Sequence, residues 1–419
     1  TTYDNYDPVG NLLQYTLPNG VVTTSTFDPL NRLATTGSTK GSALSSFTYT
    51  RFPEGNVNTL AELNGRHVTY GYDNIYRLTS EAIAGDPGGN NGTVAYPQYD
   101  KVGNRSQRTS TLGAVPPASY SYDANDRLTT DTYDNNGNTI FSGGIAFGYD
   151  FENRLVSRGA VTIVYDGEGN RVSETAAGVT TKYLVDTLNP TGYTQVIDEL
   201  VNGSMIRTYA YGLSRISEDQ LVGSAWTPSF YGYDGHMNVR FLSNPLGVAT
   251  DTYQFDAFGN QITSVGTTSN NYLFSAEQLD RNLSLYHLRA RYYNILTGRF
   301  ETMDPGKETC CALRAPQVGN IFDPPTLHKY AYTANNPVNR IDPNGRDAIL
   351  EYAVQLGEDE EGMTALRATK IAVQDELRNA CLEEQIALLQ TYPMYEGVPF
   401  LVLYNEARAF CYALIPDIP

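Results

Sequence analysis

One short pattern recurs between Tyr6 and Asn260, and it limits what this chain can fold into more than any other feature. The pattern reads aromatic residue, Asp, two variable residues, Gly or Asn, Asn or Arg, and usually an apolar residue. Its ten copies begin at Tyr6, Phe27, Tyr72, Tyr99, Tyr122, Tyr133, Tyr149, Tyr165, Tyr233 and Phe255. Self-similarity of this kind is typical of a repeat architecture, so we expect one extended repetitive structure.

Each copy predicts a tight turn at its Asp. In a type I turn the side chain of the first residue can accept hydrogen bonds from backbone N–H groups two residues on, and Pro is favoured at the second position. The fourth residue often needs a positive φ, which Gly and Asn tolerate best. Asp7-Pro8-Val9-Gly10 and Asp28-Pro29-Leu30-Asn31 have these residues. The expected turn residues are Tyr6, Asp7, Gly10, Phe27, Asp28, Asn31, Tyr72, Asp73, Tyr99, Asp100, Gly103, Tyr122, Asp123, Tyr149, Asp150, Tyr165, Asp166, Gly169, Tyr233, Asp234, Phe255, Asp256 and Gly259.

The segments between the turns predict strands, because β-branched and aromatic residues alternate there with polar ones. Tyr6 and Phe27 are 21 residues apart, enough for two strands and a second turn. One hairpin per repeat predicts a long antiparallel sheet that natural twist coils around itself, with the repeated Tyr stacked in a ladder on one face. The alternative, isolated turns in an unrelated sandwich, does not explain ten copies.

Composition agrees with a β class and excludes some partners. The chain has 32 Tyr, one Trp and 37 Gly, with 18% charged residues, and Tyr favours pleated surfaces. Its formal net charge of −17 argues against nucleic acid or an anionic membrane as partner, since phosphate binding depends on clustered Lys and Arg. No uninterrupted apolar run is long enough for a membrane span.

Other kinds of site have little support in the sequence. Four cysteines, irregularly spaced, predict neither a disulfide framework nor a zinc site, and they leave the disulfide pairing and the redox compartment open. The four histidines lie far apart, and GxSxG is absent, so we expect no metal, no cofactor and no nucleophile elbow. Thr1 falls within a repeat, which indicates a processed product or an excised piece.

Two blocks that follow the repeats carry a resemblance to a known family. LYHLRARYYNILTGRFETMDP, residues 285–305, is similar to the core signature of RHS (YD-repeat) proteins, and LHKYAYTANNPVNRIDPNG, residues 327–345, to the block that closes that core. The matching signature residues are Arg289, Arg291, Tyr292, Tyr293, Gly298, Arg299 and Phe300. The family includes bacterial RHS polymorphic toxins, the cocoon component of insecticidal toxin complexes and animal teneurins.

The resemblance implies a secreted or surface-exposed bacterial protein whose sheet is wound into a hollow shell. It implies three parts: YD repeats over 1–284, a closing core region over 285–345, and a variable C-terminal segment over 346–419. In toxin members the shell holds a C-terminal effector, which is often released by internal aspartyl autoproteolysis. Cell-surface partners or glycans are further candidates for such a protein.

Autoproteolysis is the one reaction that the residues support. The family pattern uses two Asp-Pro-x-Gly elements, and two close carboxylates can act as acid and base on one peptide bond. Residues 342–345, Asp-Pro-Asn-Gly, match the second element, with Arg340 close by. The resemblance then implies cleavage between Arg346 and Asp347.

The first Asp-Pro element departs from the family pattern. Asp304 is followed by Pro and Gly with no intervening residue, whereas Asp323 has the expected spacing but no Gly. Arg346 stands where the family commonly has an apolar residue. The plainer interpretation is that Asp304, Asp323 and Asp342 only form Asp-Pro turns.

After Arg346 the spacing of the apolar residues changes from that of strands to that of a helix. Residues 362–390 have the stripe of an amphipathic helix, and residues 347–354 predict a shorter one. The mostly helical segment is either a small effector or docking element, or a plug packed on or in the shell.

We therefore expect a shell that encloses or presents its C-terminal segment in toxin delivery or intercellular contact. One alternative is a structural subunit that forms an extracellular filament or sheath by strand-edge pairing with its neighbours, since a start within a repeat leaves an edge unpaired. Another is an autoprotease that cleaves itself once.

Overall fold

The computed structural model describes residues 1–305, 328–346 and 349–350, all within a unit that spans Thr1–Gly357. Asp323, the four cysteines and the expected helix over 362–390 lie outside the described residues. Within them, strands predominate, and the helical elements are short 3-10 turns at Phe274–Ala276 (η1) and Tyr332–Asn335 (η3). The prediction of a mainly β protein is confirmed.

The first sheet has 11 antiparallel strands, each hydrogen-bonded to its neighbours in sequence. Such a meander is what one hairpin per repeat predicts. The strands are β1 (Thr2–Tyr6), β2 (Leu12–Thr16), β3 (Val22–Phe27), β4 (Leu33–Lys40), β5 (Ser42–Arg51), β6 (Val57–Glu62), β7 (His67–Tyr72), β8 (Leu78–Ala84), β9 (Gly92–Tyr99), β10 (Arg105–Ser110) and β11 (Ala118–Ser119).

The second sheet continues the same pattern over 14 strands in sequence order. They are β12 (Thr132–Tyr133), β13 (Thr139–Ser142), β14 (Ile145–Tyr149), β15 (Leu155–Arg158), β16 (Val161–Tyr165), β17 (Arg171–Ala176), β18 (Val179–Asp186), β19 (Gln195–Val201), β20 (Ser204–Tyr211), β21 (Arg215–Val222), β22 (Ala225–Tyr233), β23 (Val239–Ser243), β24 (Ala249–Phe255) and β25 (Gln261–Val265).

The expected single sheet is therefore interrupted between β11 and β12. Two copies of the repeat begin there at Tyr122 and Tyr133, only 11 residues apart. That spacing cannot hold two strands and a turn of ordinary length. One isolated bridge, between Tyr122 and Leu128, lies in the gap.

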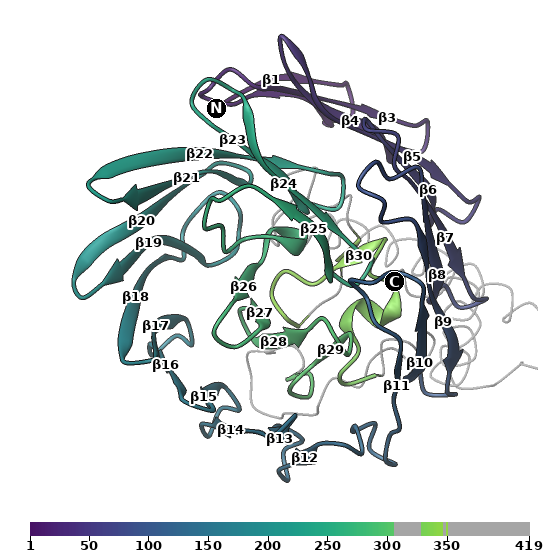
Figure 1. Ribbon diagram of the computed structural model, residues 1–419, viewed down its shortest axis with the longest axis vertical. Helices are drawn as coiled ribbons and strands as arrows, with labels where there is room; N and C mark the ends of the chain where they lie inside the picture. The colour runs from purple at the N-terminus through teal and green to yellow at the C-terminus, as the bar shows by residue number, and fades with distance from the viewer. Residues whose placement is uncertain (306–327, 347–348, 351–419) are drawn as a thin grey trace, which may run out of the picture. The chain divides into compact units, whose positions relative to one another are not determined.

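A small sheet, formed by the signature block and one strand that precedes it, lies inside the curve of these long sheets (Figure 1). Its strands are β26 (Gln278–Asp280), β27 (Leu285–Leu288), β28 (Arg291–Asn294) and β29 (Arg299–Phe300). Beside it, β30 (Arg340–Ile341) pairs with β31 (Ile349–Leu350). Ile349 and Leu350 fall in the stretch 347–354, where the sequence predicts a short helix. That prediction is wrong at these two residues, which form a strand.

Alternating side chains explain which side of the sheets is buried. In β16, Val161 and Ile163 are buried while Thr162 and Val164 are exposed, as the two-residue period of a strand requires. Phe147, Leu155, Val161 and Ile163 of the second sheet form one cluster with Leu283 and with Leu285 and Tyr292 of the signature block. The hydrophobic core thus joins the long sheets to the small one.

The end of the second sheet also packs on the first. The backbone N–H of Gly235 donates to the Tyr49 hydroxyl at 2.8 Å, and the ring of Phe258 lies 5.0 Å from that of Tyr96. An ion pair of 2.7 Å joins Arg240 to Glu62. The winding sheet therefore contacts its own earlier strands through buried side chains.

Candidate functional site

The Asp of most repeats closes its turn with hydrogen bonds from the backbone to one carboxylate oxygen and from a side chain to the other. Asp7 Oδ1 accepts the N–H groups of Val9 and Asn11 at 3.0 and 2.9 Å, and Oδ2 accepts Asn11 Nδ2 at 2.7 Å. The same three bonds recur at Asp28, Asp100 and Asp256, among others. Burial raises the pKa of Asp100, but hydrogen bonds from Asn104 and the backbone outweigh it and lower that pKa below its usual value.

The residue that follows the left-handed position has a role that sequence reasoning missed. Asn and Arg recur there because both carry side-chain N–H groups that reach the turn carboxylate. Several also reach the next turn along the sheet, as Asn104 does to Asp126 Oδ1 at 2.8 Å. The sequence contained a sign of this role, because the position holds either Asn or Arg in the copies of the repeat.

The repeated Tyr residues bond to the preceding repeat. The hydroxyl of Tyr99 donates to the Leu78 carbonyl at 2.7 Å, and that of Tyr122 to the Arg105 carbonyl at 2.8 Å. The Arg77 guanidinium lies 4.4 Å from the centre of the Tyr99 ring. At these positions the expected ladder of stacked rings is instead a series of hydroxyl bonds to the preceding repeat, with Arg77 lying over the Tyr99 ring.

Residues of the signature block hold the small sheet to the turns. The ring of Tyr293 stacks on Tyr332 at 4.2 Å between centroids, and its hydroxyl donates to the Phe258 carbonyl. Arg299 donates to Asn104 Oδ1 at 2.9 Å. Gly298 has φ +70°, and a Cβ there would lie 2.8 Å from Arg105 Nη2, so this position needs glycine. Tyr292 and Phe300 are buried in core clusters.

Arg171 joins β17 of the long sheet to β26. Its Nη1 lies 2.6 Å from Asp280 Oδ2 and 3.3 Å from Glu174 Oε2, and its Nη2 donates to Gln278 Oε1. All three charged side chains are buried. Burial and the adjacent Asp280 carboxylate raise the pKa of Glu174 to about 8.

Two of the three candidate carboxylates meet on one arginine of the signature. Arg291 Nη2 lies 3.1 Å from Asp304 Oδ2 and 3.1 Å from Asp342 Oδ2. The Asp342 side chain is 2% exposed and that of Asp304 is 32% exposed. The backbone N–H of Arg346, beside the implied cleavage point, donates to Asp342 Oδ1 at 2.9 Å.

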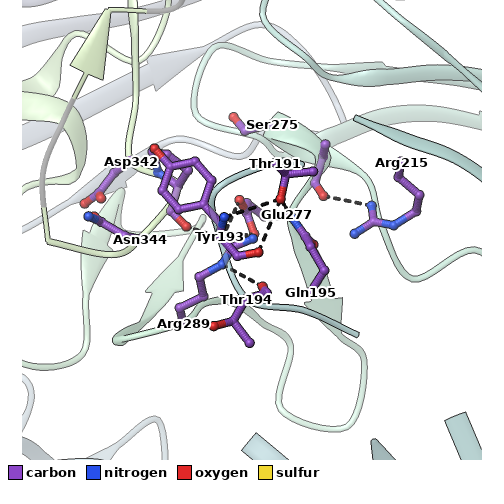
Figure 2. A network of polar contacts seen from close by, with 12 residues as sticks. Thr191, Tyr193, Thr194, Gln195, Arg215, Ser275, Glu277, Arg289, Asp342 and Asn344 are labelled. Atoms are coloured by element: carbon purple, nitrogen blue, oxygen red, sulfur yellow. Dashed lines mark hydrogen bonds and ion pairs between the residues drawn. The ribbon is translucent and has the colours of Figure 1, made fainter. Parts of the chain in front are cut away.

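Arg289 holds the same turn from its other side. Its guanidinium donates to the Pro343 carbonyl and to both oxygens of Glu277, at 3.0 and 3.1 Å. Its Nε donates to the carbonyl of Thr194, which precedes β19. Figure 2 shows Arg289 reaching Glu277 and Thr194, with Asp342 and Asn344 nearby.

The structure does not bring every candidate to this place. Arg340 lies in β30, where its backbone carbonyl is 3.3 Å from His236 Nε2. Within the described ranges, the cation that contacts the two carboxylates is Arg291. The site comprises Asp304, Asp342, Arg291 and the turn over 342–345, and no group of metal-ligating residues is found in the described part of the chain.

A sequence profile described as RHS Repeat matches residues 6–43. The match covers one part of the repeat region. The chain is 29% identical over 272 residues to the tRNA nuclease WapA of Bacillus subtilis, and 28% identical over 363 residues to a tRNA-specific nuclease WapA of Bacillus spizizenii. Those alignments cover 61% and 81% of the chain.

Solved structures share the fold of the chain. The crystal structure of TcdB2-TccC3 superposes on 81% of it with a TM-score of 0.64 at 18% identity, and a Tc holotoxin pore of Photorhabdus luminescens on 83% with a TM-score of 0.64 at 17% identity. Identities this low concern the fold alone, which is that of an RHS shell.

The chain is much shorter than these proteins. It spans 11% and 14% of the length of the two WapA proteins, and 19% of each solved chain. In the described part of the chain, no helix has the length and apolar character needed to cross a membrane.

Proposed function

We propose that this chain forms the wall of an RHS-type shell, at the cell surface or outside the cell, and encloses the polypeptide that follows Arg346. The role of such a shell is toxin delivery or contact between cells. Two observations support this kind of role. The WapA relatives are named as nucleases, and the chain shares its fold with the Tc structures.

The observation that carries the proposal is the anchoring of the turn over 342–345. Arg289 follows the last residue of β27, and Arg291 is the first residue of β28. Their guanidinium groups donate to the carbonyls of this turn and to the carboxylate of Asp342. The small sheet to which they belong lies inside the curve of the long sheets (Figure 1). The following segment therefore starts from the inner side of the wall.

Limited digestion with trypsin tests enclosure. We expect the cleavage sites after Arg367, Lys370, Arg378 and Arg408 to be cut much more slowly in the native chain than in the chain unfolded in urea, because the wall excludes the protease. Peptide masses read at successive times give the rates. Equal rates at these sites in both states would exclude enclosure.

Self-cleavage is a second candidate function, favoured by the two carboxylates on Arg291. Hydrolysis of the bond between Arg346 and Asp347 consumes one water: one carboxylate takes a proton from the water as its oxygen attacks the Arg346 carbonyl carbon, and the other, protonated, gives a proton to the departing nitrogen of Asp347. Two carboxylates, one guanidinium and one proton carry no net charge, which makes the burial of Asp342 tolerable.

Intact-mass measurement tests this second function. We expect the purified chain to give two masses, one ending at Arg346 and one beginning at Asp347, and Asp342→Asn to give one full-length mass. Asp73→Asn is the matched control, because Asp73 closes a repeat turn through the same kinds of bond far from the site. A single full-length mass for the unmodified chain would rule self-cleavage out.

A further inference from the structure

Three buried glutamates occupy the same position in three repeats of the long sheets. In each repeat an aromatic residue at the end of one strand pairs with a residue at the start of the next strand, and the glutamate follows that partner by three residues. The pairs are Tyr72 with Leu78, Tyr165 with Arg171 and Tyr211 with Arg215. We call Glu81, Glu174 and Glu218 the wall glutamates, and they are 1%, 4% and 0% exposed.

The fold does not require a carboxyl group at this position. Strands β4 and β6 hold Thr36 and Leu60 there, and both side chains are buried. Burial of a carboxylate is costly unless a cation and hydrogen bonds compensate for it. The charges around each wall glutamate therefore decide whether it keeps its proton.

Glu81 meets a second carboxyl group where the end of the second sheet packs on the first. Its two carboxyl oxygens accept the backbone N–H of Ala257 at 3.1 and 3.0 Å, and the preceding residue, Asp256, is 3% exposed. Burial and the charge of Asp256 raise the pKa of Glu81 well above its ordinary value. The two carboxyl groups at this contact therefore favour holding a proton.

The cations near Glu81 and Asp256 are engaged elsewhere. Arg66, which faces Glu81 from the turn between β6 and β7, forms ion pairs with other carboxylates. Arg105 and Arg108 face Asp256 from β10 and donate to backbone carbonyls. The phenols that also face Glu81 are neutral, because burial raises the pKa of both; they are those of Tyr70 and Tyr96.

At Glu174 one cation serves two carboxyl groups. Arg171 contacts Asp280 at 2.6 Å and Glu174 at 3.3 Å, and the Asn282 side chain donates to Glu174 Oε1 at 2.6 Å. Burial raises the pKa of Asp280, but hydrogen bonding with Glu174 and the charge of Arg171 outweigh it and lower that pKa. The pair therefore holds one proton near neutral pH, and this proton is on Glu174. The nearby phenols of Tyr183 and Tyr292 have a pKa raised by burial.

Glu218 repeats this arrangement on β21. Arg207 lies 2.7 Å from Glu199 and 3.7 Å from Glu218. The Tyr231 hydroxyl donates to Glu218 Oε2 at 3.0 Å, whereas Oε1 is buried without a hydrogen-bond partner among the described residues. Arg215 also faces Glu218, and its guanidinium lies over aromatic rings. Burial raises the pKa of Glu218 to about 7.

Each wall glutamate contacts the stretch that leads from the end of the second sheet to the small sheet. The partners are the Ala257 N–H for Glu81, the Asn282 side chain for Glu174 and, through the Tyr231 hydroxyl, Asn270 for Glu218. Ionisation of a wall glutamate places a second negative charge beside Asp256, Asp280 or Glu199. Like charges at a buried contact weaken it.

We propose that the wall glutamates form a pH-dependent switch between the long sheets and residues 256–282. With its proton, each carboxyl group stabilises its contact with this stretch. When the proton passes to water, the carboxylate repels its neighbour and the contact loosens. The switch does not depend on self-cleavage or on what the shell encloses.

The direction of the pH dependence follows from the pKa values of the folded and unfolded chain. Glutamate has an ordinary pKa of 4.5, whereas the folded chain raises it to about 8 at Glu174 and to about 7 at Glu218. Folding therefore takes up protons above pH 4.5, and stability falls as the pH rises through the folded values. His287 and His328 act in the opposite direction only below their ordinary pKa of 6.5, because burial lowers the pKa of both.

Urea unfolding of the full chain at about pH 7 and about pH 8 tests the switch, since each proton released changes the unfolding constant about tenfold per pH unit. We expect the constant to be at least about tenfold larger at the higher pH. The variant with Glu81→Gln, Glu174→Gln and Glu218→Gln should change less than about twofold, because the amide does not ionise. Glu168→Gln is the matched control: this glutamate is exposed in a repeat turn, and its replacement should keep the full pH dependence.

Infrared spectroscopy of the folded chain detects the protons themselves. At about pH 7 an ordinary carboxyl group is ionised, so absorption by protonated carboxyl groups must come from perturbed ones. We expect this absorption in the unmodified chain, and each Glu→Gln replacement at a wall glutamate should remove part of it. Glu168→Gln should leave it unchanged.

Two results would overturn the switch. One is a folded, unmodified chain without this absorption at about pH 7. The other is a triple variant whose unfolding constant depends on pH as strongly as that of the unmodified chain, which would leave the glutamates a purely structural role. Should the triple variant fail to fold, Glu81→Gln alone decides by the same two measurements.

Discussion

Replacement of Arg171 by Met is expected to lower the free energy of unfolding by about 3–5 kcal/mol. The guanidinium is the cation between the buried carboxylates of Asp280 and Glu174, and Met fills a similar volume without charge. Removal of the guanidinium leaves the buried carboxylate of Asp280 without a counter-ion, next to the carboxyl group of Glu174. Because Arg171 lies in the long sheet and Asp280 in the small one, the variant should loosen the interior of the shell before the wall itself.

Urea unfolding followed by circular dichroism measures the effect. Arg32→Met is the matched control: Arg32 also pairs with an Asp, but both side chains are about a quarter exposed, so the loss should stay below about 1 kcal/mol. Adding Asp280→Asn to Arg171→Met should restore part of the stability, because it removes the charge left alone. Equal losses for Arg171→Met and Arg32→Met would contradict the buried network.

The second large effect is expected for Phe258→Ala, at about 3–5 kcal/mol. Phe258 is the third residue of a repeat turn, fully buried, with the Arg105 guanidinium 4.1 Å from its ring centre and Tyr96 packed edge-on. It is a contact through which the end of the second sheet packs on the first. Truncation leaves a cavity at this overlap that the rigid strands cannot close.

Val102 gives the matched control for this prediction. It occupies the same third position in the turn at Asp100, yet it is 56% exposed. Val102→Ala should change stability by no more than about 0.5 kcal/mol. Thermal and urea unfolding of both variants measure the difference, and a small effect for Phe258→Ala would show that the two sheets do not pack here in solution.

These predictions concern contacts that the repeat pattern does not reveal. Phe258 and Val102 stand at equivalent positions of the same motif, and only the winding of the sheet decides which is covered. Tyr76 and Met237 make the same point for the backbone: they adopt φ of 65° and 60° at turn positions where Gly or Asn is expected. The surrounding hydrogen bonds of the turn hold them in that conformation.

The candidate site was predictable only in part. The resemblance led to Asp342 and Asp304, which the structure places on one guanidinium, and to Arg340, whose contacts lie elsewhere. Arg291 belonged to the expected signature, but nothing in its neighbours along the chain indicates that it meets both carboxylates. Asp323 stays a prediction.

The sequence by itself determined the turns and the β class of this protein, because each turn is closed by bonds within five consecutive residues, as from Asp7 to Asn11. Local bonds of this kind do not depend on the rest of the chain. Tertiary structure alone decided the overlap at Phe258 and the meeting of Asp304 with Asp342. Those contacts join residues far apart in sequence, and the curvature accumulated over many strands sets which of them come together.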